Sequence, residues 1–270
     1  MDTEHFPLEE LLPNIAVQLR SALSNLHLAA AQLVPAPLRE ADPELDAKAA
    51  LLDRSYYQVL RLVNNLTAAA CLEGEEDWPK QDWDIVEIIS SLCDECTALS
   101  RLTGVDLRFF CPMERHVCAV NRGALEQLLF QLLSNGIKFT PPGGVVIVEL
   151  KRSEMYLRLS VLDTGRGIEE ERLPFLFDRF LQGGLMDPQP HGLGLGLALC
   201  RRIAEAMGGG IMAESRLGKG SRFTVSIPDR RCGTIGVSDV QVDYTGGFNR
   251  TLLALADAMP TEAFYIRNQG

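Results

Sequence analysis

Several features common in other protein classes are missing from this sequence. No run of about twenty apolar residues, the length that a membrane-spanning helix needs, occurs in the chain. The first ten residues, MDTEHFPLEE, lack the basic start and apolar stretch of a secretion signal. Cations are scarce, with 26 Lys and Arg against 36 Asp and Glu, whereas a nucleic-acid-binding surface needs clustered cations. We therefore expect a cytoplasmic protein with no membrane span and no nucleic-acid partner.

The composition is typical of a globular protein. The 270 residues, 46% hydrophobic and 23% charged, are enough for two domains. Residues 1–78 contain thirteen acidic and five basic side chains, whereas residues 79–230 contain nineteen and eighteen. The net charge of -10 therefore comes mostly from the first third of the chain. Seven cysteines, an odd number in a chain without a secretion signal, are best explained as reduced thiols.

The first third of the chain has the pattern of two amphipathic helices. Apolar residues recur at alternating spacings of three and four in two stripes: Ala16, Leu19, Leu23, Leu26, Ala30 and Leu33, then Leu52, Tyr56, Val59, Val63, Leu66 and Ala70. Pro35 and Pro37 separate the stripes, which predicts an antiparallel helical hairpin within residues 1–74. One hairpin encloses little apolar surface, so we expect two to pair as a four-helix bundle. Residues 75–82 are charged, contain a proline and are expected to form a linker.

Residues 83–230 have a mixed pattern of helices and strands. Leu157, Leu159 and Val161 alternate with Arg158 and Ser160, which is typical of a strand with one buried face. Helices are predicted over residues 83–102, 124–139 and 195–208, and strands over residues 105–110, 145–150, 156–163, 210–215 and 222–228. We expect an antiparallel or mixed sheet covered on one side by helices, so the whole chain is predicted to be α+β.

Three polar side chains share one face of the helix predicted over residues 124–139. Gln131, Asn135 and Lys138 lie at positions i, i+4 and i+7, while leucines occupy another face. Two amides and an ammonium suit a hydrated metal ion and phosphate oxygens. A solvated polar face explains the same spacing, so this helix alone leaves both interpretations open.

Two glycine-containing segments add to this pattern. Asp163 ends a predicted strand and opens the sequence DTGRGI, where its carboxylate can accept a hydrogen bond from an amine such as that of adenine. Gly165 and Gly167 let the backbone approach such a base closely. The second segment, GLGLGL, leads into a helix whose first N–H groups and dipole favour an anion. Its glycines are Gly192, Gly194 and Gly196.

The order of these motifs resembles that of one protein family. The succession FQLLSNGIKFTPPGG, DTGRGI, FLFDRF, GLGLGLALCRRIAEAMGG and ESRLGKGSRFTVSIP is similar to the ATP-binding catalytic domain of sensor histidine kinases, over about residues 80–228. The resemblance implies the family's ATPase α/β sandwich, with ATP and Mg²⁺ as ligands. The hairpin is similar to the family's dimerisation and phosphoacceptor domain, with VQLRSAL in place of the usual H-E-L-R-T-P-L.

The resemblance also implies roles for the motif residues. Asn135 would bind Mg²⁺, Lys138 would contact phosphate, and Asp163 would bind the adenine amine. Gln131 stands where the family often has another asparagine, so metal binding is expected to survive. The glycines would line the site, with Gly165 and Gly167 at the adenine and Gly192, Gly194 and Gly196 on the phosphate side of a lid.

The phosphoacceptor box departs from the family pattern. Val17 stands at the histidine, and Gln18 stands at the acidic residue that acts as its base. Valine has no nucleophile and glutamine cannot take a proton from imidazole, so autophosphorylation at this position is chemically excluded. His27 lies ten residues further along, which is ~80° around a helix and roughly 15 Å along its axis. We therefore expect His27 to be an interfacial or surface histidine.

Two further segments leave alternatives open. Cys93 and Cys96 form a CxxC within an amphipathic helix pattern, so buried free thiols are favoured over a zinc site. Residues 231–270 contain a strand pattern over 237–244 and an amphipathic helix pattern over 248–259. This tail is either a packed extension of the catalytic domain or a docking element for a partner.

Three functions follow from these observations. The first is an ATP-dependent kinase of two-component signalling that phosphorylates a histidine on another chain. Its partners would be a response regulator or another histidine kinase, with a homodimer or heterodimer formed through the hairpin. The second is a pseudokinase, a nucleotide-dependent scaffold that regulates a true kinase, and the third is a protein serine kinase on the same fold. We expect no sensor domain within these 270 residues, and the sequence does not reveal the input signal.

Overall fold

The chain divides into two compact units. The computed structural model describes residues 8–71, 78–178, 194–236 and 249–268. Residues 1–76 and 261–270 form the first unit, which we call the hairpin unit, and residues 77–260 form the second, which we call the sheet unit. Within the described ranges, no helix combines the length and the apolar character needed to cross a membrane.

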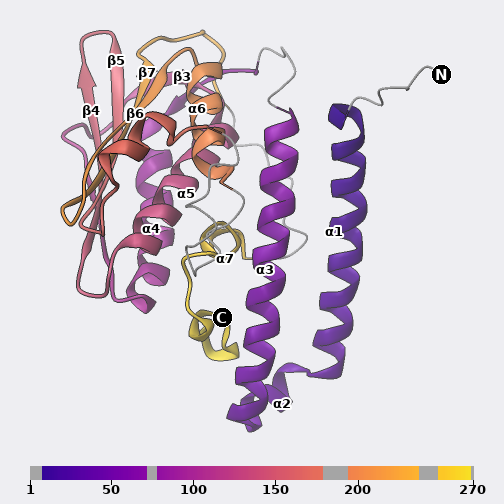
Figure 1. The fold of residues 1–270 in the computed structure, drawn as a ribbon. Coiled ribbons are helices and arrows are strands. Elements are labelled where there is room, and N and C mark those ends of the chain that lie inside the picture. The colour runs from indigo at the N-terminus through magenta and orange to yellow at the C-terminus, as the bar shows by residue number, and fades with distance from the viewer. Residues whose placement is uncertain (1–7, 72–77, 179–193, 237–248, 269–270) are drawn as a thin grey trace. The chain divides into compact units, whose positions relative to one another are not determined.

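The hairpin unit consists of two long antiparallel helices and a short one between them (Figure 1). The helices are α1 (Leu8–Leu33), α2 (Ala36–Ala41) and α3 (Pro43–Cys71). The prolines that separate the apolar stripes lie at the start of α2, a short helix that the sequence pattern did not predict. Asp42 begins α3, because its side-chain Oδ1 accepts hydrogen bonds from the backbone N–H groups of Glu44 and Leu45 at 2.9 and 3.2 Å.

The apolar stripes of the hairpin are only partly covered within one chain. On α3, Tyr56 and Val63 are buried, whereas on α1 only Ala16 of the predicted stripe is buried. Leu26 is 66% exposed and Leu33 is 79% exposed. The hairpin therefore keeps an apolar face on α1 that the described residues of its own unit do not cover.

The sheet unit is built on one five-stranded mixed sheet, in the order β2-β4-β5-β7-β6. Strands β2 and β4 are parallel and the other neighbours are antiparallel. The strands of this sheet are β2 (Asp106–Phe110), β4 (Val145–Ser153), β5 (Tyr156–Asp163), β6 (Gly210–Arg216) and β7 (Gly220–Pro228). The helices that pack on it are α4 (Ile85–Leu102), α5 (Arg122–Phe139) and α6 (Gly196–Ala206). A 3₁₀ helix, η1 (Glu170–Phe175), follows β5.

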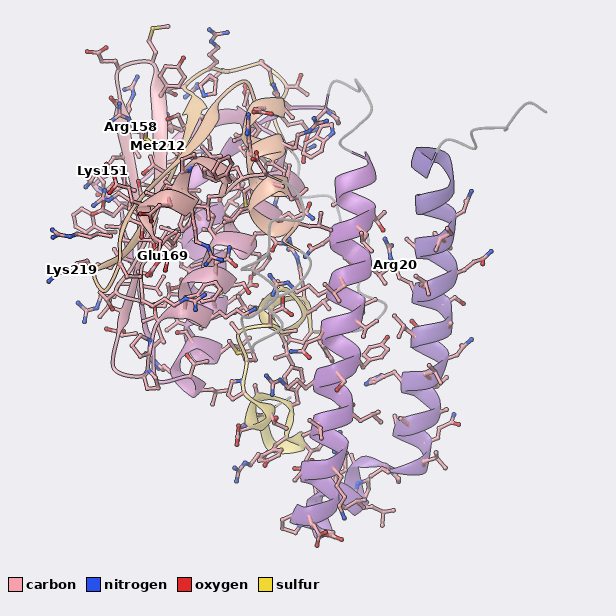
Figure 2. All side chains as sticks on the ribbon, viewed as in Figure 1. Arg20, Lys151, Arg158, Glu169, Met212 and Lys219 are labelled. Atoms are coloured by element: carbon pink, nitrogen blue, oxygen red, sulfur yellow. The ribbon has the colours of Figure 1, made fainter. Side chains whose placement is uncertain are left out.

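The helices cover one face of this sheet, as the sequence predicts (Figure 1). Val148, Val161 and Phe223 lie side by side on neighbouring strands and are buried, because alternate residues of each strand face the helices. The opposite face carries mostly polar residues, and the exposed side chains of Lys151, Arg158 and Met212 project from it away from the helices (Figure 2). The core of the unit therefore lies between one face of the sheet and the three helices.

A second, two-stranded sheet lies at the start of the unit. It pairs β1 (Gln81–Asp84) with β3 (Val117–Val120) in antiparallel fashion. Residues 75–82 were expected to be a linker, but Gln81 and Asp82 are part of β1. Asp82 is held there because its carboxylate accepts hydrogen bonds from the backbone N–H groups of Cys232 and Gly233 at 2.8 and 2.9 Å.

The C-terminal tail contributes to both units. In the sheet unit, α7 (Arg250–Leu255) packs on α4 and α5, and it is shorter than the helix predicted over residues 248–259. In the hairpin unit, two 3₁₀ turns, η2 (Thr261–Phe264) and η3 (Ile266–Asn268), pack on α3 and α2. The strand pattern over residues 237–244 lies outside the described residues.

Candidate functional site

Helix α5 positions the amide and ammonium groups that its spacing singled out. Asn121 begins the helix, since its side chain accepts a hydrogen bond from the backbone N–H of Ala124 at 2.9 Å. Gly136 brings α5 close to the sheet, because a Cβ atom there would lie 3.3 Å from Val146. Asn135 and Lys138 are both half-buried, and the Lys138 ammonium lies 5.6 Å from the ring centre of Phe139. The end of α5 thus presents an amide and a cation beside the sheet.

The carboxylate of Asp163 is held in one orientation at the end of β5. Its Oδ1 accepts hydrogen bonds from the backbone N–H groups of Gly165 and Ser221, at 2.8 and 3.3 Å. Burial raises the pKa of Asp163 above its ordinary value, and the two N–H groups only partly offset this effect. A half-buried carboxylate that is fixed by one oxygen is suited to receive a specific hydrogen-bond donor.

Close packing around the DTGRGI turn requires its two glycines. A Cβ atom on Gly165 would lie 2.4 Å from the carbonyl oxygen of Phe139, at the end of α5. Gly167 has a φ of +69°, and a Cβ atom there would lie 2.1 Å from the carbonyl oxygen of Arg216. Both distances are far below a van der Waals contact, so only glycine fits at either position. The turn is therefore enclosed between the end of α5 and the β6–β7 connection.

The end of β6 and the start of β7 supply residues that the sequence analysis did not single out. Gly220 has a φ of +89°, and a Cβ atom there would lie 1.9 Å from the carbonyl oxygen of Asp163. Ser215 accepts a hydrogen bond from the backbone N–H of Ile168 at 2.8 Å and lies 3.0 Å from the hydroxyl of Ser221. In the sequence, Gly220 and Ser221 are indicated by GKGS (residues 218–221), which lies between two predicted strands. Only the pairing of β5 with β7 shows that this segment lies next to Asp163.

The second glycine segment begins helix α6. Gly194 has a φ of +68°, a left-handed conformation that favours glycine, and α6 starts at Gly196 without a side-chain cap. The N-cap residue, Leu195, therefore provides no side-chain cap for the first N–H groups of α6. Gln131 is buried, and its Oε1 lies 3.0 Å from the position that a Cβ atom on Gly196 would take. Gly192 lies outside the described residues.

In the hairpin unit, the VQLRSAL segment lies on α1 with its first residue in solvent. Val17 is 61% exposed and Gln18 is exposed beside it. Arg20 points toward α3 (Figure 2), where its guanidinium donates a hydrogen bond to the Thr67 hydroxyl at 3.1 Å. This position therefore presents an aliphatic side chain to solvent where phosphotransfer would need a nucleophile.

Comparisons with known proteins identify the family. Residues 120–231 match the model of the histidine kinase-, DNA gyrase B- and HSP90-like ATPases. The chain is 34% identical over 181 residues to histidine protein kinase DivJ of Caulobacter vibrioides, an alignment that covers 67% of this chain and 30% of DivJ. It is 30% identical over 224 residues to sensor protein SrrB of Staphylococcus aureus, covering 82% of this chain and 38% of SrrB. The chain belongs to the sensor histidine kinase family. It spans about a third of the length of these curated relatives.

Solved structures of histidine kinases share the fold. The full-length kinase ShkA, crystallised in complex with AMPPNP, aligns with a TM-score of 0.67 and 25% identity, covering 81% of this chain and 45% of ShkA. The catalytic domain of histidine kinase ThkA aligns with a TM-score of 0.50 and 26% identity, covering 56% of this chain and 95% of that domain. The resemblance predicted from the motifs, and the α+β architecture predicted with it, are therefore confirmed.

His27 is packed by side chains of its own hairpin unit. Its Nε2 lies 3.3 Å from Oδ1 of Asp53, and its ring stacks on Tyr56 with 4.5 Å between ring centres. Its side chain is 25% exposed. His27 is thus packed between α1 and α3, in agreement with the interfacial histidine that its spacing from Val17 predicts.

The two cysteines of the CxxC motif are buried thiols. Cys93 and Cys96 lie on the inner face of α4 and are 2% and 0% exposed. Burial raises the pKa of the Cys93 thiol to about 12, so this thiol is protonated at neutral pH. Within the described ranges, no three His, Cys, Asp or Glu side chains are grouped as a metal site would require.

We expect Gly165→Ala to destabilise the sheet unit. The new methyl group would overlap the Phe139 carbonyl, and overpacking of this kind costs about 1–3 kcal/mol. Both tryptophans, Trp78 and Trp83, belong to the sheet unit, so thermal unfolding followed by their fluorescence reports on that unit. Gly210→Ala is the control, because no atom lies within 4 Å of a Cβ there. Equal melting temperatures for the two variants would show that Gly165 is not enclosed.

Proposed function

We propose that this histidine kinase homologue binds Mg-ATP in its sheet unit and transfers the γ-phosphoryl group to a histidine of another chain. The observation that carries the proposal is a contrast between the units. The turn around Asp163 is closed and ordered by hydrogen bonds, whereas Val17, at the expected acceptor position, is exposed and has no nucleophile. A retained nucleotide site without an acceptor supports transfer to another molecule.

The residues around Asp163 fit an adenine nucleotide. The carboxylate would accept a hydrogen bond from the exocyclic amine of the base, and Gly165 and Gly167 would leave room for the ring. The N-terminus of α6, which no side chain caps, would receive phosphate oxygens on its backbone N–H groups. The AMPPNP complex of ShkA supports the same ligand class for this chain.

Asn135 is the residue that best fits a magnesium ion. Its amide is half-buried at the end of α5, and Mg²⁺ prefers oxygen ligands while keeping several waters. The ion would neutralise charge on the phosphates, and Lys138 would contribute a second positive charge. Gln131 is buried against the start of α6, so the metal role suggested for it stays a prediction.

We further propose that the hairpin pairs with a second hairpin, either from the same protein or from another histidine kinase. The support is the apolar face of α1, where Leu26 and Leu33 are 66% and 79% exposed. Burial of these side chains in a four-helix bundle would remove them from water. A response regulator as downstream partner and a cytoplasmic location stay predictions.

A pseudokinase is the second candidate, and the position of Gln131 favours it. An amide buried beside Gly196 is less available to a metal than one that faces phosphate, so nucleotide binding could persist without transfer. In that case, the chain would act as a nucleotide-dependent scaffold for a true kinase or a response regulator.

Incubation with γ-labelled Mg-ATP separates these functions. In transfer, the bond between the γ-phosphorus and the bridging oxygen breaks, an N–P bond forms, and the imidazole proton is lost while ADP leaves. We expect acid-labile label on a partner histidine kinase whose own nucleotide site is disabled, and none on this chain. Acid-labile label on this chain would contradict the loss of its acceptor, and acid-stable label would indicate a serine kinase. An ATP-induced rise in Tm without any label would establish the pseudokinase.

A further inference from the structure

We infer that residues 261–268 are an internal ligand of the hairpin, and that they attach the sheet unit to the hairpin at a second place, far from the first. The chain leaves the hairpin after α3, which ends at Cys71, and it returns from the sheet unit between Pro260 and Thr261. The consequence is a restriction on how the two units move. This inference goes beyond the proposed function and does not depend on nucleotide binding.

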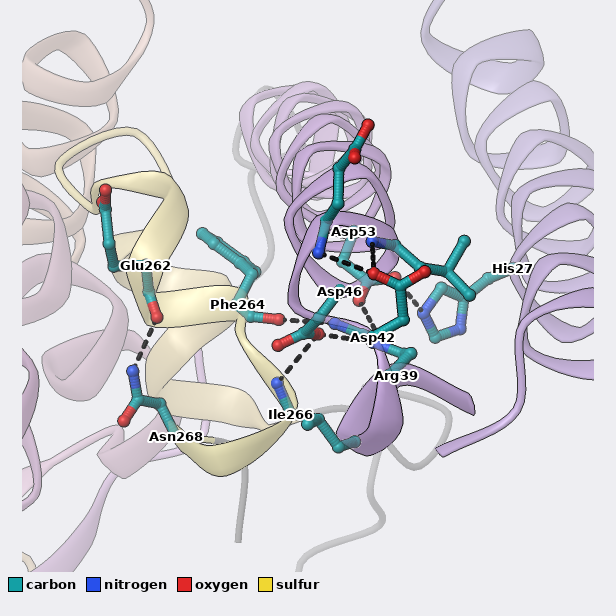
Figure 3. A network of polar contacts seen from close by, with 11 residues as sticks. His27, Arg39, Asp42, Asp46, Asp53, Glu262, Phe264, Ile266 and Asn268 are labelled. Carbon is teal, nitrogen blue, oxygen red and sulfur yellow. Dashed lines mark hydrogen bonds and ion pairs between the residues drawn. The ribbon is translucent and has the colours of Figure 1, made fainter. Parts of the chain in front are cut away.

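A buried arginine binds the C-terminal segment to the hairpin. Arg39, on α2, is 8% exposed and donates a hydrogen bond to the backbone carbonyl of Phe264 at 2.9 Å (Figure 3). The same guanidinium donates to Asp46 at 2.8 Å and to Asp53 at 2.7 Å, both on α3. Asp46 also accepts a hydrogen bond from the backbone N–H of Ile266 at 3.3 Å. The segment thus completes a polar network that would otherwise leave buried groups unpaired.

Aromatic packing anchors the same segment. Phe264 is fully buried, and its ring meets that of Tyr57 edge to face with 5.4 Å between the centres. Ala263 is also fully buried, and Thr261 accepts a hydrogen bond from Arg54 at 3.3 Å. Burial of a phenylalanine side chain contributes about 1.5–3 kcal/mol, so this segment is held by apolar as well as polar contacts.

The residues just before the segment are anchored in the sheet unit. Arg250, at the start of α7, forms an ion pair with the buried Glu126 of α5. The Thr251 hydroxyl donates a hydrogen bond to Glu95 of α4 at 2.9 Å. Met259 is 1% exposed and belongs to the same unit. The tail is thus fixed in one unit up to Met259 and in the other from Ala263 onward.

The chain itself limits how far these two anchors can separate. Four residues lie between the anchor at Met259 and that at Phe264, so five residue-to-residue steps bound their separation at about 18 Å when fully extended. On α3, the tail binds near Asp46, whereas the other connection leaves after Cys71, about 37 Å further along the helix axis. Because the sheet unit is connected to the hairpin at two separated places along α3, it cannot rotate freely about either connection alone.

This restriction concerns catalysis on the hairpin itself. A catalytic unit that phosphorylates its own hairpin must move to reach the acceptor and then withdraw. This chain has no acceptor at Val17, so it does not need the movement that a second attachment would restrict. The tail would then limit how far the sheet unit can move from the hairpin.

Lengthening the connection between Pro260 and Thr261 tests the inference. About twenty Gly and Ser residues inserted there would leave both anchors in place but remove the limit on their separation. Spin labels at Lys48→Cys and Lys219→Cys, both exposed, would report the distance between the units in a background with Cys71→Ser, Cys111→Ser and Cys232→Ser. We expect the distribution of that distance to become at least twofold broader, in the absence of nucleotide.

The same insertion placed after Gly270 is the matched control, since it adds equal chain without changing either connection. Equal widths for both insertions would overturn the inference. Amide hydrogen exchange provides an independent check, because the N–H of Ile266 should exchange at least tenfold more slowly than in a peptide. Peptide-like exchange there would show that the segment is not bound. Since no ATP is present, failure of the proposed function would leave both measurements unchanged.

Discussion

Replacement of Asp163 by asparagine should abolish the rise in Tm that Mg-ATP causes. The substitution keeps the shape of the side chain and the oxygen that Gly165 and Ser221 bind, but it puts an NH₂ donor where a carboxylate oxygen would face the donor amine of adenine. The variant loses a hydrogen bond to a charged group, and two N–H donors then face each other. Together these changes weaken the free energy of nucleotide binding by about 3 kcal/mol or more, which is a 100-fold or larger loss of affinity. Thermal unfolding with and without Mg-ATP measures the effect.

The unliganded protein provides the control for this prediction. Burial raises the pKa of Asp163, which means that the folded protein disfavours its ionised form at neutral pH. Removal of the charge should therefore leave the Tm without ligand no lower than that of the wild type. Asp106→Asn, at an exposed carboxylate of β2, should keep the full response to ATP. A retained ATP response in Asp163→Asn would exclude Asp163 as the adenine ligand.

Replacement of Arg39 by alanine should strongly destabilise the hairpin unit. It removes the cation from two buried carboxylates, Asp46 and Asp53, and the donor from the Phe264 carbonyl. Removal of one partner from a buried ion pair costs about 3–5 kcal/mol, because the remaining charge is buried alone. Amide hydrogen exchange along α3 should accelerate by about 100-fold or more. Tryptophan fluorescence should show unchanged unfolding of the sheet unit, since both tryptophans lie there.

The pH dependence identifies the cause of this loss. Burial opposes ionisation of Asp53, but hydrogen bonds from His27 and Arg39 outweigh it and hold the pKa of the carboxyl below 3.8. In the wild type, this stabilisation is present above the unfolded pKa and is lost as the pH falls through the folded pKa. Without Arg39, burial would raise the pKa of Asp53 instead. Acidification should therefore reduce the difference in the free energy of unfolding between the wild type and Arg39→Ala, which we call the deficit of the variant. A deficit that is the same at pH 7 and about pH 5 would show that lost packing, not charge, is responsible.

The hydrogen-exchange measurement has its own matched variant. Lys48→Ala removes an exposed ion pair with Glu44 one turn away on the same helix, at a cost of about 0.5 kcal/mol or less. Its exchange rates along α3 should stay close to those of the wild type. If Lys48→Ala and Arg39→Ala accelerate exchange equally, the buried network does not hold the hairpin together.

Local features of the chain were sufficient to predict its family and most of its elements. Asp84, Asn121 and Asn249 begin helices through hydrogen bonds to residues two or three positions away, which a sequence pattern can indicate. The motif order predicted the ATPase fold, and the replacement of an acceptor histidine by Val17 is visible in the sequence alone. These inferences depend on neighbours along the chain and on chemistry that a residue type either has or lacks.

Contacts between distant segments were decided only by the tertiary structure. Ser221 and Gly220 lie more than fifty residues from Asp163, and the pairing of β5 with β7 brings Ser221 to its carboxylate and Gly220 to its backbone carbonyl. The Arg39 network joins α2 to a backbone carbonyl 225 residues away, at Phe264. A backbone carbonyl has no sequence signature, so no pattern could show that this tail belongs partly to the sheet unit and partly to the hairpin. The sequence by itself determined which chemistry is present and which is lost, and the fold determined which distant groups meet.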